Sequence, residues 1–218
     1  MHLNLSAMKP LITLTCLVMS YCAVHAATTL TNTYIINTSV PDNSGIGISN
    51  TQQVSTEITS ISEVSIQVTM SGGWSGDIYA YITHGSGFAV LLNRPGRSLI
   101  EPAGSGTIDL SVILADSAAT DIHTGIPASG SLSGIYQPDA RAIDPDNSLD
   151  TTPRTAFLSS FNGLDPNGNW TLYVADVATG DTMTVANWSL TISGVPEPAT
   201  GLLASLGASL YCVRRKRN

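Results

Sequence analysis

The chain has 218 residues, a formal net charge of −7 and three cysteines. Residues 27–193 contain no lysine and only four arginines, so they offer no basic face to phosphate groups, which argues against nucleic acid and anionic lipid as partners. The cysteines all lie outside residues 27–193, so that region forms no disulfide bond and depends on packing for its stability.

The first 26 residues have the pattern of a secretory signal peptide. Lys9 supplies positive charge, residues 11–18 form a short apolar region, and Ala26 ends a stretch at which a signal peptidase would cut. We therefore expect the secretion machinery to export the chain, and the mature protein to begin at Ala27.

Apolar and polar residues alternate repeatedly through residues 27–193, which is the period of a half-buried strand. Clusters of Gly, Asn, Ser and Pro separate these segments and are typical of turns. The pattern predicts an all-β domain, a jelly-roll β-sandwich of about eight strands, with Trp170 and Trp188 in one core. The expected strands include 33–37, 64–70, 78–82, 89–92, 108–112, 170–174 and 188–192.

Residues 115–155 interrupt the alternation. They are rich in Ser, Gly, Pro and Asp and have little periodicity. Long structureless loops are unusual in compact domains and are often functional. We expect one long excursion over the sandwich, held by Tyr136 and Ile143.

Several motifs within residues 33–193 are shared with a known family. They are Val-Pro-Asp-Asn (40–43), Gly-Asp-Ile-Tyr-Ala-Tyr-Ile (76–82), 91–96, 161–163, Asn-Gly-Asn-Trp-Thr-Leu-Tyr-Val-Ala-Asp (167–176), 180–182 and 187–192. This region resembles the P domain, or P/Homo B domain, found beside subtilisin-like proprotein convertases. The resemblance implies an eight-stranded jelly roll that has no catalytic residues and stabilises a neighbouring protease domain. Because we find no protease domain in this sequence, we do not expect that role here.

The carboxyl-terminal residues 194–218 combine a proline motif, a small apolar run and a basic cluster. The motif is Val195, Pro196, Glu197 and Pro198, and the basic cluster is Arg214, Arg215, Lys216 and Arg217. This order resembles the PEP-CTERM sorting signal of Gram-negative bacteria, which an exosortase recognises and processes. The resemblance implies transient inner-membrane anchoring, followed by release to the cell surface or the extracellular space. A plain tail anchor is the alternative, although the run is shorter than the roughly 20 apolar residues that a span needs.

Acidic residues at the predicted strand ends are candidate ligands for structural calcium, which takes oxygen ligands from flexible turns. The first set is Asp42, Asp77, Asp176 and Asp181. A second set in the long excursion is Asp139, Asp144, Asp146 and Asp150. The alternative is that these aspartates only cap turns and solvate loops.

Only His84 and His123 remain as histidines after removal of the signal peptide. Neither lies in the context of a nucleophile elbow, and two distant histidines without cysteine do not make a zinc site. We expect both at the surface and expect no catalytic residues.

A carbohydrate site is a further candidate. Trp74, Tyr79, Tyr81 and Tyr136 are aromatic, and Tyr79 and Tyr81 are predicted to share the outer face of one strand. Amphipathic rings can offer a flat platform to a sugar. The alternative is that they pack beneath the long excursion.

Together these features predict a non-catalytic exported protein of the cell surface or the extracellular matrix, sorted by an exosortase. The second hypothesis is a carbohydrate-binding or adhesive module of the exopolysaccharide matrix. The third is an unrecognised hydrolase.

Overall fold

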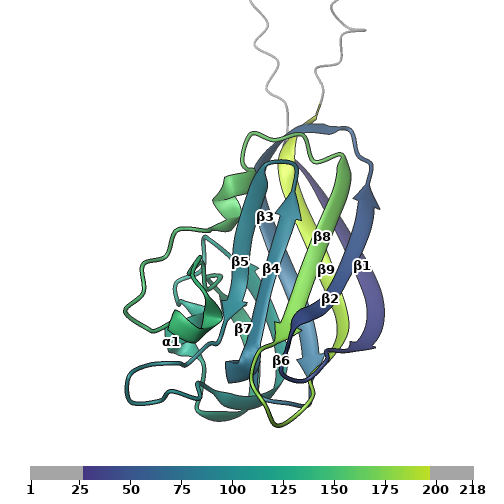
Figure 1. Ribbon diagram of the computed structural model, residues 1–218. Helices are drawn as coiled ribbons and strands as arrows, with labels where there is room; N and C mark the ends of the chain where they lie inside the picture. The colour runs from purple at the N-terminus through teal and green to yellow at the C-terminus, as the bar shows by residue number, and fades with distance from the viewer. Residues whose placement is uncertain (1–26, 197–218) are drawn as a thin grey trace, which may run out of the picture.

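The computed structural model describes residues 27–196, and strands make up most of them (Figure 1). The strands are β1 (Thr28–Ser39), β2 (Ser44–Val54), β3 (Ile58–Ser71), β4 (Ile78–His84), β5 (Gly87–Asn93), β6 (Gly106–Ala115), β7 (Ser129–Tyr136), β8 (Gly168–Asp176) and β9 (Thr184–Pro196). The short helical elements are η1 (Ser75–Asp77), α1 (Ile122–Gly125), η2 (Pro145–Asn147) and η3 (Leu158–Phe161).

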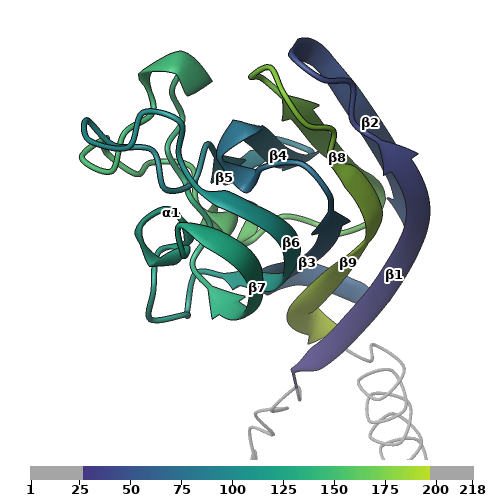
Figure 2. The same cartoon turned by 90° about the horizontal axis from the view of Figure 1, so that it is seen from below.

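The strands form two sheets. The five-stranded sheet has the order β1-β9-β3-β6-β7, and the four-stranded sheet has the order β2-β8-β4-β5. Neighbouring strands are antiparallel except for β6 and β7, which are parallel. The consecutive strands β1 and β2 belong to different sheets, so the chain crosses from one layer to the other at residues 40–43 (Figure 2).

The core lies between the two sheets. Alternate residues of β3 and β4 are buried, and buried side chains from both sheets belong to one hydrophobic cluster. Trp170 of β8 and Trp188 of β9 are fully buried in it, as the sequence predicts. Each indole N–H is paired, with the carbonyl of Pro166 and the side-chain oxygen of Asn50 respectively, both at 2.9 Å. The prediction of a β domain is therefore confirmed at the level of a mostly β structure built from two sheets.

Every strand segment expected from alternation lies within an observed strand. Two further strands, β2 and β7, bring the count in the described region to nine rather than about eight. Both are rich in Gly, Ser and other small polar residues, and both lie at a sheet edge. Edge strands bury little, so their sequences need not alternate strongly.

The excursion 115–155 is not one irregular loop. It contains α1 and β7, and β7 pairs with β6 over eight residues. Tyr136 packs against the core, as expected. Ile143 is 39% exposed, so the prediction that it holds the excursion is wrong. The buried Ile122 and Leu132 and the polar contacts described below hold the segment.

The described chain enters and leaves the fold at one place. Thr28 pairs with Gly194, and β9 continues to Pro196, which pairs with Ile58 of β3. Val195 and Pro196, assigned above to the sorting segment, are thus the last residues of a strand. Residues 1–26 and 197–218, which carry the predicted signal peptide and the rest of the sorting segment, lie outside the described residues. Within residues 27–196 no helix has the length and apolarity needed to span a membrane.

Candidate functional site

The four aspartates of the first predicted calcium set gather at one end of the sandwich. Asp176 ends β8, and Asp77 immediately precedes β4, whose first residue Ile78 pairs with Asp176. Asp42, in the β1–β2 turn, accepts a hydrogen bond from the N–H of Gly180 at 3.2 Å. The negative charges of Asp42 and Asp181 both raise the pKa of Asp77, so these carboxylates are close enough to interact electrostatically.

One arginine offsets part of this negative charge. Arg94 is 8% exposed, and its guanidinium lies 3.7 Å from Asp77 and 3.5 Å from Asp146. Its Nε donates to the carbonyl of Gly76 at 3.0 Å. Arg94 also has a left-handed backbone, with φ of 51°, which is uncommon for a side chain other than glycine. The guanidinium that lies near both Asp77 and Asp146 therefore belongs to a residue with an uncommon backbone conformation.

Asp176 is only partly satisfied in this arrangement. It has no solvent exposure, one carboxylate oxygen accepts from the N–H of Ala178 at 3.3 Å, and Oδ2 has no hydrogen-bond partner. Burial, with the nearby charges of Asp77 and Asp42, raises the pKa of Asp176 to about 6. Burial also raises the pKa of Asp77, and the positive charge of Arg94 opposes that rise. The end of the sandwich thus holds a buried carboxylate that is expensive to ionise.

The geometry does not complete a cation cage. In residues 27–196, no three or more His, Cys, Asp or Glu side chains are grouped closely enough to hold a metal ion. The orphan oxygen of Asp176 is the feature that fits a cation, and the guanidinium of Arg94 is the feature that competes with one. Calcium at this end of the domain stays a prediction.

The second predicted acidic set is dispersed. Asp139 is buried and bonds to His123, whereas Asp144 caps η2 through the N–H of Asp146. Asp146 faces Arg94, and Asp150 lies at the surface. Each of these carboxylates therefore serves a different local contact.

Both histidines are buried, at 6% exposure for His84 and 1% for His123, so the prediction of surface histidines is wrong. The His84 ring nitrogens lie 3.0 and 2.7 Å from the carbonyl oxygens of Asn169 and Asp165. Its ring stacks on Trp170 with centroids 4.3 Å apart and an interplanar angle of 1°. Stacking and two carbonyl contacts explain why this residue leaves the surface at the end of β4.

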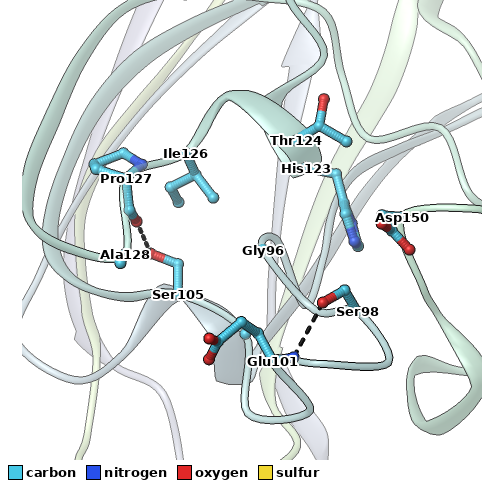
Figure 3. A pocket seen from close by; sticks show the side chains of 11 residues that line it. Gly96, Ser98, Glu101, Ser105, His123, Thr124, Ile126, Pro127, Ala128 and Asp150 are labelled. Atoms are coloured by element: carbon cyan, nitrogen blue, oxygen red, sulfur yellow. Dashed lines mark hydrogen bonds between the residues drawn. The ribbon is translucent and has the colours of Figure 1, made fainter.

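His123 is fixed in the same manner. Its Nδ1 lies 2.8 Å from the carboxylate of Asp139, and its Nε2 lies 2.9 Å from the carbonyl of Arg97. It borders a cavity of about 320 Å³ that Ser98 also lines (Figure 3). The Ser98 hydroxyl accepts from the N–H of Glu101 at 3.0 Å rather than contacting the imidazole. Neither described histidine therefore has a hydroxyl or thiol to activate.

The Asp139–His123 pair belongs to a polar network that anchors the excursion. Arg141 is 2% exposed and donates to the carboxylates of Asp139 at 3.2 Å and Asp121 at 2.9 Å. It also donates to the carbonyl of Leu149 at 2.9 Å. Sequence reasoning missed this network, because its members come from both ends of a segment that has no periodicity.

Four aromatic rings form a continuous patch on the outer face of the four-stranded sheet. The patch comprises Tyr79 and Tyr81 of β4, Tyr173 of β8 and Phe88 of β5; we call it the aromatic face. Tyr81 stacks on Tyr173 with centroids 4.6 Å apart, lies 5.3 Å from Phe88 and lies 5.8 Å from Tyr79.

The other two predicted carbohydrate residues lie elsewhere. Trp74 is 43% exposed and comes from the β3–η1 connection, where its ring lies close to Gly106 of β6. Tyr136 belongs to β7 in the opposite sheet and packs against the core. The structure therefore brings Tyr79 and Tyr81 together with two rings that the sequence did not single out.

One family model matches part of the chain. The model of the "Proprotein convertase P-domain" family matches residues 127–192, which include β7, β8 and most of β9. This part of the chain resembles a P-domain. The match contains the motifs at 161–163, 167–176, 180–182 and 187–192, and that family is a non-catalytic regulatory domain.

Solved structures give a weaker likeness. The serine protease of Aeromonas sobria in complex with the chaperone ORF2 is 14% identical, with a TM-score of 0.46, over 79% of this chain and 28% of that one. The same protease in a second structure is 14% identical, with a TM-score of 0.45, over 78% and 27%. The chain thus spans less than a third of the length of these proteins. No curated protein sequence matches it.

Proposed function

We propose that this chain is a non-catalytic, exported P-domain-like protein that an exosortase sorts to the cell surface or the extracellular matrix. The P-domain match over residues 127–192 and the two-sheet architecture support the first part. We propose that the whole of residues 27–196 has jelly-roll connectivity. The Pro-Glu-Pro motif and basic cluster of the carboxyl terminus support the second part.

The observation that carries the non-catalytic role is the state of the two histidines. Both ring nitrogens of His84 and of His123 face carbonyl or carboxylate oxygens. A general base must reach the proton that it removes, and these nitrogens are already engaged. Neither of these histidines therefore supports the third hypothesis, an unrecognised hydrolase.

The observation that supports sorting is the position of the motif. Pro196, the last described residue, still pairs with Ile58 of β3, so the start of the motif adjoins the sandwich. Glu197 and Pro198 follow at once in the sequence. A processing enzyme would therefore meet its motif next to a completed domain, and cleavage there would free the sandwich from the apolar run and its basic cluster.

Sorting is tested by expressing the full chain in an export-competent Gram-negative host, with and without an exosortase. We expect the mass of the surface form to lack Arg214–Arg217 only when the exosortase is present. Glu197→Gln should block the change, whereas Glu57→Gln, at an exposed glutamate within the domain, should not. A surface form that keeps its basic cluster in the presence of the exosortase would refute the proposal.

Carbohydrate binding is the second candidate, and the aromatic face favours it. Three half-buried tyrosines and a half-buried phenylalanine are in contact on the outer face of one sheet, and amphipathic rings of this kind can pack against a sugar.

A further inference from the structure

We propose that the aromatic face binds a neutral polysaccharide, with Tyr81 and Tyr173 as its central rings. This inference deepens the second candidate of the proposed function and rests on it, but it does not depend on how the chain is sorted.

The rings are held in place before any ligand arrives. Tyr81 and Tyr173 are directly opposite each other in the β4–β8 ladder and stack with an interplanar angle of 19°. The Tyr173 hydroxyl donates to the carbonyl of Gly45 in β2. Phe88 and Tyr79 support Tyr81 from two sides. A surface of rigid rings loses little conformational entropy on binding, which favours affinity.

Hydroxyl groups lie in line beside the rings. Thr51, Thr171 and Thr83 occupy one row across β2, β8 and β4, and the same row ends at Phe88 of β5. The hydroxyls of Thr51 and Thr171 are 2.9 Å apart. A sugar ring has an apolar C–H face and a rim of hydroxyls, so it can pack on an aromatic side chain while its hydroxyls exchange hydrogen bonds with threonine.

Charge on the four strands selects a neutral ligand. Apart from tyrosine, their only ionisable residues are His84 and Asp176, and both are buried. Burial raises the pKa of Tyr79 and of Tyr173 above the usual value, so both hydroxyls stay protonated at neutral pH. The face therefore offers no cation to a uronic acid or a phosphate.

The net charge of the chain points the same way. At −7 the chain repels polyanionic polysaccharides and further copies of itself. A charged protein partner would find no ion pair on this face. An uncharged polyhydroxylated polymer is not repelled by the net charge of the chain and does not need an ion pair on this face.

One side of the face is bounded and the other is open. Ala140 of the excursion and Ala156, directly after it, hydrogen-bond to Val90 of β5, which is buried. Ser49 and Thr51 of β2 are exposed at the opposite edge. A linear chain can therefore cross the strands along the hydroxyl row and extend past β2 into solvent.

The test is binding of the purified full chain to soluble dextran, β-glucan and galactomannan, with alginate as the polyanion, followed by calorimetry and tyrosine fluorescence. We expect binding to at least one neutral polymer and none to alginate. Tyr81→Ala and Tyr173→Ala should each weaken it by about tenfold or more. Trp74→Ala removes an exposed aromatic ring outside the face and should leave the affinity unchanged.

A second variant separates loss of the site from loss of the fold. Thr51→Arg puts a bulky charge at an exposed position of the same face without disturbing the core, and it should weaken binding with an unchanged melting temperature. The inference is overturned if none of the three neutral polymers binds, if alginate binds more tightly, or if Trp74→Ala weakens binding as much as Tyr81→Ala does. None of these results bears on exosortase processing, which the mass of the surface form reports separately.

Discussion

Asp176 offers the sharpest test of the electrostatics at the acidic end. Its carboxyl has a folded pKa of about 6 against 3.8 for an ordinary aspartate, and one of its oxygens has no partner. A difference of about two pKa units corresponds to about 3 kcal/mol between the protonated and ionised forms. Because the folded pKa is the higher one, folding favours the proton. This contribution is therefore fully present below pH 4 and is lost as the pH rises through 6.

Asp176→Asn removes the charge while keeping the shape of the side chain. In chelator, we expect the free energy of unfolding to change little at pH 4 and to rise by up to about 3 kcal/mol at pH 8. Urea titrations from pH 4 to 8, followed by the fluorescence of the buried Trp170 and Trp188, measure it. Asp181→Asn removes the same charge at an exposed position of the same end and should change stability by less than about 0.5 kcal/mol.

A variant that is less stable than the wild type at pH 8, or that keeps the wild-type pH dependence, would refute the reasoning. The same titration tests the calcium prediction. A bound cation would raise wild-type stability at pH 8 over its value in chelator, and Asp176→Asn would lose that increase.

Two further predictions concern packing and the buried network. Gly87→Ala makes the new Cβ clash with the buried Phe161 ring, so we expect a loss of about 1–3 kcal/mol in urea unfolding, whereas Gly45→Ala meets no atom within 4 Å and should cost far less. Arg141→Met removes a buried cation and leaves the Asp139 carboxylate without it, so we expect a loss of about 3–5 kcal/mol by the same assay. Stability equal to that of the wild type in either variant would contradict the contacts described.

The sequence predicts those strands that bury one face strongly. In β3 and β4 the alternation of apolar and polar residues matches the observed burial almost residue by residue. β7 is not predicted from the sequence because only Leu132 of its eight residues is buried. β2 is not predicted because its glycines and amide side chains show no apolar alternation; its position is set by its pairing with β8. Where pairing rather than burial fixes a strand, the residues carry little signal.

In the candidate sites, likewise, the sequence predicts the residues that a local pattern places and misses those that long-range pairing places. Tyr79 and Tyr81 are two residues apart on one strand, so the period of two places them on one face. Tyr173 joins them only through the β4–β8 register, which no local pattern encodes. The Asp139–His123 contact likewise depends on how the excursion folds back, and so the buried histidines could not be inferred from their sequence neighbours.

The pairing of Thr28 with Gly194 separates both ends of the described chain from the acidic residues. Amino and carboxyl ends emerge together at one pole, while β9 spans about 40 Å from there to the turn beside Asp176. The aspartate-rich tip therefore lies at the opposite pole from both ends of the described chain, and Tyr79, Tyr81 and their neighbours lie on the flank between the poles. Attachment at the shared pole would leave the acidic tip and the aromatic flank away from the point of attachment.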